Sequence, residues 1–222
     1  MHRIATREAT GKLPMLRTST VAADTGGAIT LVALFAGLAV AVLTGRTQQV
    51  DDRLRRAQRH PRRGLRRDVA VAVKEGGKPA AQLPIGAAIT GLLHAAEVPG
   101  ATAVAAAAVG VFVADKSIKH LVDRRRPSGY VARRERYESF PSGHTAATAA
   151  VSLTTAGLLQ RAGVVRAPLG TCVALLMTAG VGETRLILDE HWPSDVLAGA
   201  LLGGATALAA LAIAAHAGPA DV

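Results

Sequence analysis

Long apolar stretches alternate with strongly basic ones along this chain. Thr25 to Gly45 carries no charged residue over 21 positions, and Ser139 to Gln160 carries none over 22. A helix needs about 20 residues to cross the hydrocarbon core of a bilayer. Six stretches of this kind predict an all-α fold, a six-transmembrane-helix bundle formed by residues 25–222, with spans at 25–45, 79–97, 100–118, 139–160, 167–182 and 196–220.

Small residues dominate these stretches. Half of the residues are hydrophobic, but only 3% are aromatic, and the chain holds 23 glycines. Small side chains let helix backbones approach closely in lipid, where no hydrophobic force drives helices together. The single Cys172 lies within an apolar stretch and excludes a disulfide framework, so we expect it to be a small core residue.

Two polar segments flank the first predicted span. Residues 1–24 are basic and Thr-rich, and we expect a flexible N-terminal tail. Residues 46–78 contain eleven Arg and Lys against four acids, with only a partial apolar face. This segment is either a solvated loop or an interfacial helix that lies on anionic lipid.

The net charge of +10 bears on the partners of the protein. Nucleic-acid binders rarely combine such a charge with membrane-length apolar segments, so we expect no nucleic acid. Anionic lipid headgroups or a phosphate substrate fit the pattern better, and the predicted location is the cell membrane, spanned several times. The sequence does not indicate an oligomeric state.

Three polar clusters fall at the ends of predicted spans. Because the other connections are short hairpins, the six-span topology puts all three clusters on one face of the membrane. They are Lys119-x6-Arg126-Pro127 after the third span, Phe140-Pro141-Ser142-Gly143-His144 at the start of the fourth, and Arg185-x5-His191-x3-Asp195 between the fifth and sixth.

These residue types suit phosphoryl transfer. A phosphate in its transition state is stabilised by fixed donors, and Lys119, Arg126 and Arg185 supply positive charge. Ser142 and Gly143 open a helix, so their backbone N–H groups are expected to be free for an anion. Gly143 also allows a close backbone approach. Pro193 suits the first turn of the last helix and directs a second helix start at the site.

The three clusters together resemble the pattern of the type 2 phosphatidic acid phosphatase superfamily (PAP2), in its membrane-embedded lipid phosphatase branch. The motifs run in order from Lys119 to Asp195, about a third of the chain, and only Thr184 departs, where the family usually has Ser. The resemblance implies His191 as the nucleophile of a phosphohistidine intermediate. Asp195 would hold the His191 ring, and His144 would protonate the leaving group and then activate water. It implies no metal and no cofactor.

Other polar residues near the motifs receive no catalytic role. Asp123, Asp189 and Glu190 stand at unspecified positions of the pattern, and the aromatic residues near span ends are expected to be interfacial anchors. We assign the remaining arginines mainly to lipid surface attraction. The aromatic anchors are Trp192, Tyr130 and Tyr137, and the arginines are Arg124, Arg125, Arg133, Arg134 and Arg136.

The predicted substrate is a lipid phosphate: a phosphatidate, a phosphatidylglycerol phosphate or a polyprenyl (di)phosphate. Two alternatives remain, a vanadium-haloperoxidase-like enzyme, since those proteins hold vanadate in the same cradle, and a non-catalytic lipid-binding membrane protein. Twenty Lys and Arg lie on the active-site side against six on the other. The positive-inside rule therefore favours a site that opens to the cytoplasm.

Overall fold

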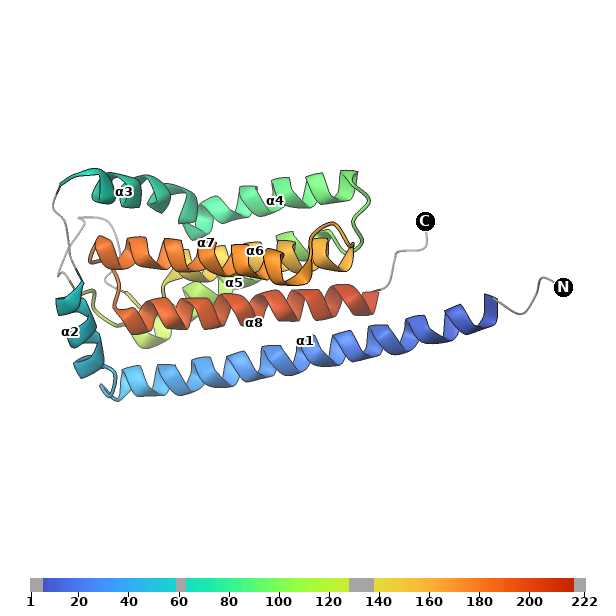
Figure 1. Ribbon diagram of the computed structural model, residues 1–222. Coiled ribbons are helices and arrows are strands. Elements are labelled where there is room, and N and C mark those ends of the chain that lie inside the picture. The colour runs from blue at the N-terminus through green and yellow to red at the C-terminus, as the bar shows by residue number, and fades with distance from the viewer. Residues whose placement is uncertain (1–5, 59–62, 128–137, 218–222) are drawn as a thin grey trace.

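Residues 6–58, 63–127 and 138–217 are described in a computed structural model of the chain. Within these ranges the chain is all-α, with eight helices (Figure 1). They are α1 (Thr6–Leu43), α2 (Gln48–Ala57), α3 (Leu65–Gly77), α4 (Pro79–Ala95), α5 (Thr102–Val122), α6 (Gly143–Arg161), α7 (Ala167–Ile187) and α8 (Pro193–Ala217).

Six helices form the body of the molecule, and each corresponds to one predicted span. Helix α6 contacts α4, α5, α7 and α8, and α1 lies along α8 at the edge of the bundle. The last turns of α5 and α7 and the first turns of α6 and α8 meet at one end of the bundle. That end is where α2 and α3 are found (Figure 1).

Two of the helices in the described ranges are long and apolar enough by themselves to cross a membrane: Thr20–Leu43 within α1, and α8. The other four predicted spans stay below that standard. Helix α4 has only 17 residues, while α5 carries Asp115 and Lys119 in its C-terminal half and α7 carries Arg185 in its last turn. For these four helices the six-span topology remains a prediction.

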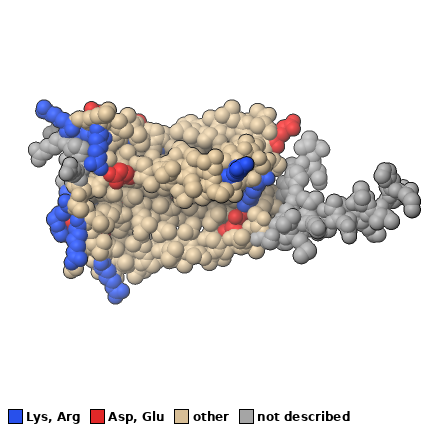
Figure 2. All heavy atoms as spheres, in the orientation of Figure 1, with Lys and Arg blue, Asp and Glu red and all other residues tan. Residues whose placement is uncertain are grey.

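The charged side chains gather at the two ends of the molecule. In Figure 2, Lys and Arg cluster at the end that holds α2 and α3, and a broad uncharged belt follows. This distribution matches what a bilayer requires of the surface that it covers.

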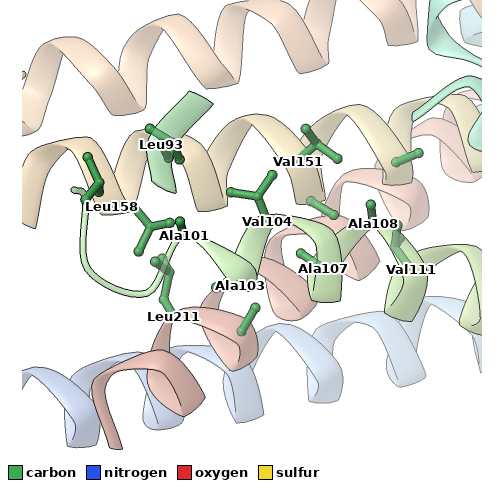
Figure 3. Close-up of a cluster of buried hydrophobic side chains, with 14 of the residues drawn as sticks. Leu93, Ala101, Ala103, Val104, Ala107, Ala108, Val111, Val151, Leu158 and Leu211 are labelled. Carbon is green, nitrogen blue, oxygen red and sulfur yellow. The ribbon is translucent and has the colours of Figure 1, made fainter. Parts of the chain in front are cut away.

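The core is built mainly from alanine and valine. Val104, Ala107 and Val111 of α5 (Figure 3) are buried in one hydrophobic cluster together with Ala146 and Ala150 of α6. Side chains this small bring the helix axes close together, as the abundance of small residues predicted.

Two glycines of α8 set its distance from α6. A Cβ at Gly199 would lie 2.5 Å from the Ser142 carbonyl oxygen, and a Cβ at Gly203 would overlap the Ala146 carbonyl. Both glycines face the same side of α8 because they are four residues apart. Their close approach brings the first turn of α8 against the start of α6, where two of the motifs lie.

The polar segments on either side of the first predicted span are largely helical in the described residues, not a flexible tail and a loop. Helix α1 begins at Thr6, so most of the expected N-terminal tail is helical and continuous with the span. Residues 46–78 contain α2 and α3. On α3, Ala70 and Gly77 are buried against the bundle, whereas Leu65 and Val69 are exposed, as an interfacial helix would require. Residues 59–62 lie outside the described ranges.

Candidate active site

The three motifs meet at the same end of the bundle, as the sequence predicts. Ser142 is the N-cap of α6, and His144 lies in its first turn. His191 lies in the connection between α7 and α8, one residue before the N-cap Trp192. The remaining motif residues lie in the last turn of α5 (Lys119), after α5 (Arg126), in the last turn of α7 (Arg185) and in the first turn of α8 (Asp195).

His191 and Asp195 form a buried pair. The Nδ1 atom of His191 lies 3.6 Å from Oδ2 of Asp195, and their side chains are 3% and 0% exposed. This separation is slightly longer than a hydrogen bond, as is common at catalytic pairs before substrate binds. The arrangement favours the tautomer with the proton on Nδ1, which leaves the Nε2 lone pair for attack.

The surroundings keep the His191 ring neutral. Burial lowers the pKa of His191 below its ordinary value of 6.5, although the carboxylate of Asp195 acts in the opposite direction. Arg126 and Lys119 lower the pKa further because they disfavour a second positive charge nearby. A neutral imidazole is the form that can act as a nucleophile.

Asp195 is held by more than its histidine. Its Oδ2 accepts a hydrogen bond from the Trp192 backbone N–H at 2.9 Å, which caps α8. Its Oδ1 accepts one from Arg124 Nη1 at 2.6 Å. Arg124 also donates to Ser194 Oγ at 2.7 Å and to Asp51 Oδ2 of α2 at 2.7 Å. The carboxylate that faces His191 is therefore held by two further donors, the Trp192 N–H and Arg124.

Arg124 and Asp51 were not predicted for the site. From the sequence, Arg124 is expected to attract the lipid surface, but its side chain is only 11% exposed and bridges two buried carboxylates. Asp51 also accepts from the Ser194 backbone N–H at 2.9 Å, so α2 caps the start of α8. The sequence feature that could indicate Asp51 is its place as an acid within a basic segment, because a buried carboxylate needs a cationic partner.

Lys119 reaches the site beside a buried carboxylate. Its Nζ lies 2.8 Å from Oδ2 of Asp115, one turn earlier on α5. A Cβ on Gly143 would lie 2.8 Å from both oxygens of Asp115. The Asp115 side chain therefore fills the space beside Gly143 that a Cβ would need.

The start of α6 differs from the expectation in one respect. The Ser142 N–H donates to the Asp195 carbonyl at 2.9 Å, so this donor is engaged and not free for an anion. The close contact of α8 with α6 explains the difference, because it brings the Asp195 backbone to the N-cap. Ser142 Oγ pairs with Thr145 Oγ1 at 3.0 Å. The N–H groups of Gly143, His144 and Thr145 have no acceptor within the helix, since Ala146 is the first to donate to the Ser142 carbonyl.

Glu190 connects the cations of the site, although it stands at an unspecified position of the motif pattern. Its Oε2 accepts from Arg185 Nη2 at 2.6 Å and lies 3.7 Å from Arg126 Nη1. Its Oε1 accepts from Lys74 Nζ of α3 at 2.8 Å. Burial acts to raise the pKa of Glu190, but Arg185 and Lys74 outweigh it and lower the pKa. The carboxylate is therefore ionised at neutral pH.

His144 lies close to the other motif residues. Arg185, His191 and Lys119 are near enough to act on it electrostatically. Its Nε2 is buried and has no hydrogen-bond partner among the described residues. Helix α3 covers the ring, since a Cβ on Gly77 would lie 3.3 Å from His144 Cδ2.

Two smaller expectations need correction. Trp192 is not simply an interfacial anchor, because its ring stacks near the guanidinium groups of Arg55 and Arg124, at 5.6 and 5.4 Å, and its Nε1 donates to the Arg125 carbonyl. Cys172 is exposed and not a core residue. Tyr130, Tyr137, Arg133, Arg134 and Arg136 lie outside the described residues.

The fold and the site together define the class of the protein: it is an all-α bundle that holds a buried His–Asp pair and several cations at one end. Residues 97–218, just over half of the chain, match the PAP2 superfamily, and the chain belongs to it.

Similar proteins agree with this family. The chain is 37% identical over 67 residues to phosphatidylglycerophosphatase B of Escherichia coli (strain K12) and of Shigella flexneri. These matches cover 30% of this chain and only a quarter (25%) of each relative.

A solved structure extends the likeness to most of the chain. It is a transmembrane PAP2 type phosphatidylglycerolphosphate phosphatase from Bacillus subtilis, with a TM-score of 0.73 and 23% identity. The match covers 84% of this chain and 94% of that one. At this identity the likeness shows a shared fold.

Proposed function

We propose that this protein is an integral-membrane lipid phosphatase that hydrolyses a lipid phosphate monoester or diphosphate through a phosphohistidine intermediate. The observation that carries the proposal is the buried His191–Asp195 pair beside Arg185, Arg126 and Lys119. A neutral histidine next to several cations suits attack on a bound phosphate.

In the first step, Nε2 of His191 attacks phosphorus. The N–P bond forms while the bond from phosphorus to the leaving oxygen breaks, and His144 donates its proton to that oxygen. Asp195 holds the Nδ1 proton of His191 and stabilises the charge that develops on the ring. Lys119, Arg126 and Arg185 stabilise the phosphoryl oxygens.

In the second step, His144 is neutral and takes a proton from water. The water oxygen attacks phosphorus, the N–P bond breaks, and inorganic phosphate leaves. His144 then carries the proton needed for the next turnover. Cationic side chains supply the charge stabilisation in both steps, and the proposal requires no metal.

An apolar cavity supports a lipid substrate. It has a volume of about 590 Å³ and runs along α6 between α4 and α7, from Gln82 and Thr148 to Leu159 and Leu169. Thr148 is one helical turn from His144, so the cavity begins close to the catalytic end. A hydrocarbon chain of the substrate fits such a lining.

Among lipid phosphates we favour phosphatidylglycerol phosphate. The support is that the relatives in Escherichia coli and Shigella flexneri are named phosphatidylglycerophosphatase B, and the similar solved structure is of a phosphatidylglycerolphosphate phosphatase. Phosphatidate and polyprenyl diphosphate are the substrates to compare with it.

The test is release of inorganic phosphate by the purified full-length protein from each of these three lipids. His191→Ala should abolish release, because no other group replaces the nucleophile. His94→Ala is the matched control, since His94 lies exposed in the last turn of α4. Turnover by His191→Ala at the wild-type rate would exclude the mechanism. A vanadate-dependent halogenation assay tests the haloperoxidase alternative.

A further inference from the structure

The Glu190 carboxylate occupies the place where three cations converge. Arg185 and Lys74 are hydrogen-bonded to its two oxygens, at 2.6 and 2.8 Å, and Arg126 lies 3.7 Å from one of them. The side chain of Glu190 is only 10% exposed. Two of the three cations, Arg126 and Arg185, are ones that the motifs assign to the substrate phosphate.

A carboxylate and a phosphate offer the same kind of ligand to these cations. Both present two anionic oxygens to a guanidinium, and each accepts charge-assisted hydrogen bonds from Arg and Lys. A phosphate that binds Arg126 and Arg185 must therefore share these donors with Glu190 or displace it. Any cation held by the same carboxylate then faces the phosphate as well.

We propose that Lys74 of α3 is a fourth cationic ligand of the phosphate, after Lys119, Arg126 and Arg185, and that Glu190 holds Lys74, Arg126 and Arg185 in place until the substrate anion takes over these contacts. The inference rests on the proposed function, since it takes Arg126 and Arg185 as phosphate ligands. It assigns a substrate-binding role to a helix that lies outside the three motifs.

The placement of α3 supports a role in the site. Ala70, Lys74 and Gly77 recur at a spacing of four and three residues, so they share the face of α3 that covers the bundle. Gly77 on that face packs against His144. Helix α3 is therefore a wall of the site, and Lys74 is the cation of this wall that reaches Glu190.

A second ion pair on α3 provides a matched control. Arg66 lies 2.8 Å from Glu183 of α7, with side chains 49% and 45% exposed. This pair also joins α3 to α7, but it has no contact with Glu190 or His144 among the described interactions. Loss of Arg66 tests the attachment of α3 without removing a cation from the site.

The experiment measures binding of orthovanadate and inorganic phosphate to the purified full-length protein, by calorimetry and by the shift in Tm. Glu190→Gln should bind vanadate about tenfold more tightly, because the competing charge is removed. Lys74→Gln placed in the Glu190→Gln background should lose about tenfold, because a phosphate ligand is then missing. Lys74→Met in the same Glu190→Gln background keeps the apolar stem and should give the same loss. Arg66→Gln should leave vanadate binding unchanged.

The double variant separates the two roles of Lys74. If Lys74 only neutralised Glu190, the double variant would bind vanadate as tightly as Glu190→Gln, and the proposal would be overturned. Weaker binding by Glu190→Gln than by wild type would overturn the displacement of Glu190, and no vanadate binding by wild type would overturn the proposal altogether.

Lipid hydrolysis measured in parallel keeps the two proposals apart. Lys74-dependent vanadate binding without release of phosphate from any of the three lipids leaves the Lys74 site standing and refutes the lipid phosphatase. Lipid hydrolysis together with vanadate binding that does not depend on Lys74 leaves the lipid phosphatase standing and refutes the Lys74 site.

Discussion

Arg124 Nη1 lies 2.6 Å from Oδ1 of Asp195, while Oδ2 of the same carboxylate faces His191 Nδ1 at 3.6 Å. The arginine thus holds one oxygen of Asp195 and leaves the other directed at the proposed nucleophile. Because Arg124 also binds Asp51, it links α2 to the start of α8. Asp51 of α2, in the basic segment that precedes the motifs, thereby helps to hold His191 in its orientation.

We expect Arg124→Ala to lower kcat by about 10²-fold with little change in KM, because it loosens Asp195 without removing a phosphate ligand. Steady-state hydrolysis of the lipid substrate measures both constants. Arg124→Lys should recover part of kcat. Arg125→Ala is the control, since the Arg125 side chain is exposed. A rise in KM at unchanged kcat would instead make Arg124 a substrate ligand.

Asp195→Asn should reduce stability as well as activity. It leaves the guanidinium of Arg124 without one of its two buried carboxylate partners, and breaking a buried pair costs about 3 kcal/mol. Asp189→Asn removes the partly exposed pair with Arg55 and should cost at most about 1 kcal/mol. Free energies of unfolding in detergent compare the two variants, and equal losses would contradict the buried role of Asp195.

Gly203→Ala should destabilise the bundle by about 1–3 kcal/mol, because its methyl group overlaps the Ala146 carbonyl and pushes α8 from α6. Activity should fall with it, since the same helix contact aligns Asp195 with Ser142. Gly180→Ala on α7 has open space and should be neutral or stabilising. Thermal unfolding distinguishes them, and equal Tm values would argue against the close contact.

The lowered pKa of His191 predicts a pH-dependent stability. Below about pH 6.5 the unfolded chain protonates this histidine, whereas the folded protein keeps it neutral. Folding stability is therefore lost as pH falls below the unfolded pKa, by about 1.4 kcal/mol per pH unit while the folded ring stays neutral. Relative to His191→Asn, wild type should lose about 1 kcal/mol between pH 6.5 and 5.5, because the unfolded histidine is only half protonated at the start of this interval. Parallel stability curves of the two proteins would contradict a lowered pKa.

The charge asymmetry predicts the membrane orientation of the site. With twenty Lys and Arg on the active-site side and six on the other, we propose that the site opens to the cytoplasm. Arg56→Cys on the exposed side of α2, in a Cys172→Ser background, places one thiol at the catalytic end. An impermeant thiol reagent should label it only after the cells are permeabilised. Rapid labelling of intact cells would reverse the orientation.

Much of this protein follows from its sequence alone. The long uncharged stretches determine the helices, since a backbone in apolar surroundings must satisfy its own hydrogen bonds. The short spacing of His191 and Asp195 keeps both residues at the start of α8, His191 just before the helix and Asp195 in its first turn. The order of the three motifs at span ends determines that they meet. These are local or topological properties, and a linear pattern carries them.

Tertiary structure alone decided which charged residues complete the site. Of 26 Lys and Arg, the packing selects Lys74 to reach Glu190 and Arg124 to reach Asp195. Nothing in the basic segments distinguishes these two cations from their neighbours. Their partners lie 116 and 71 residues away along the chain, so the choice depends on the register of α3 against α7 and of the post-α5 connection against α8. Long-range packing sets that register, and burial then requires each charge to find an opposite partner.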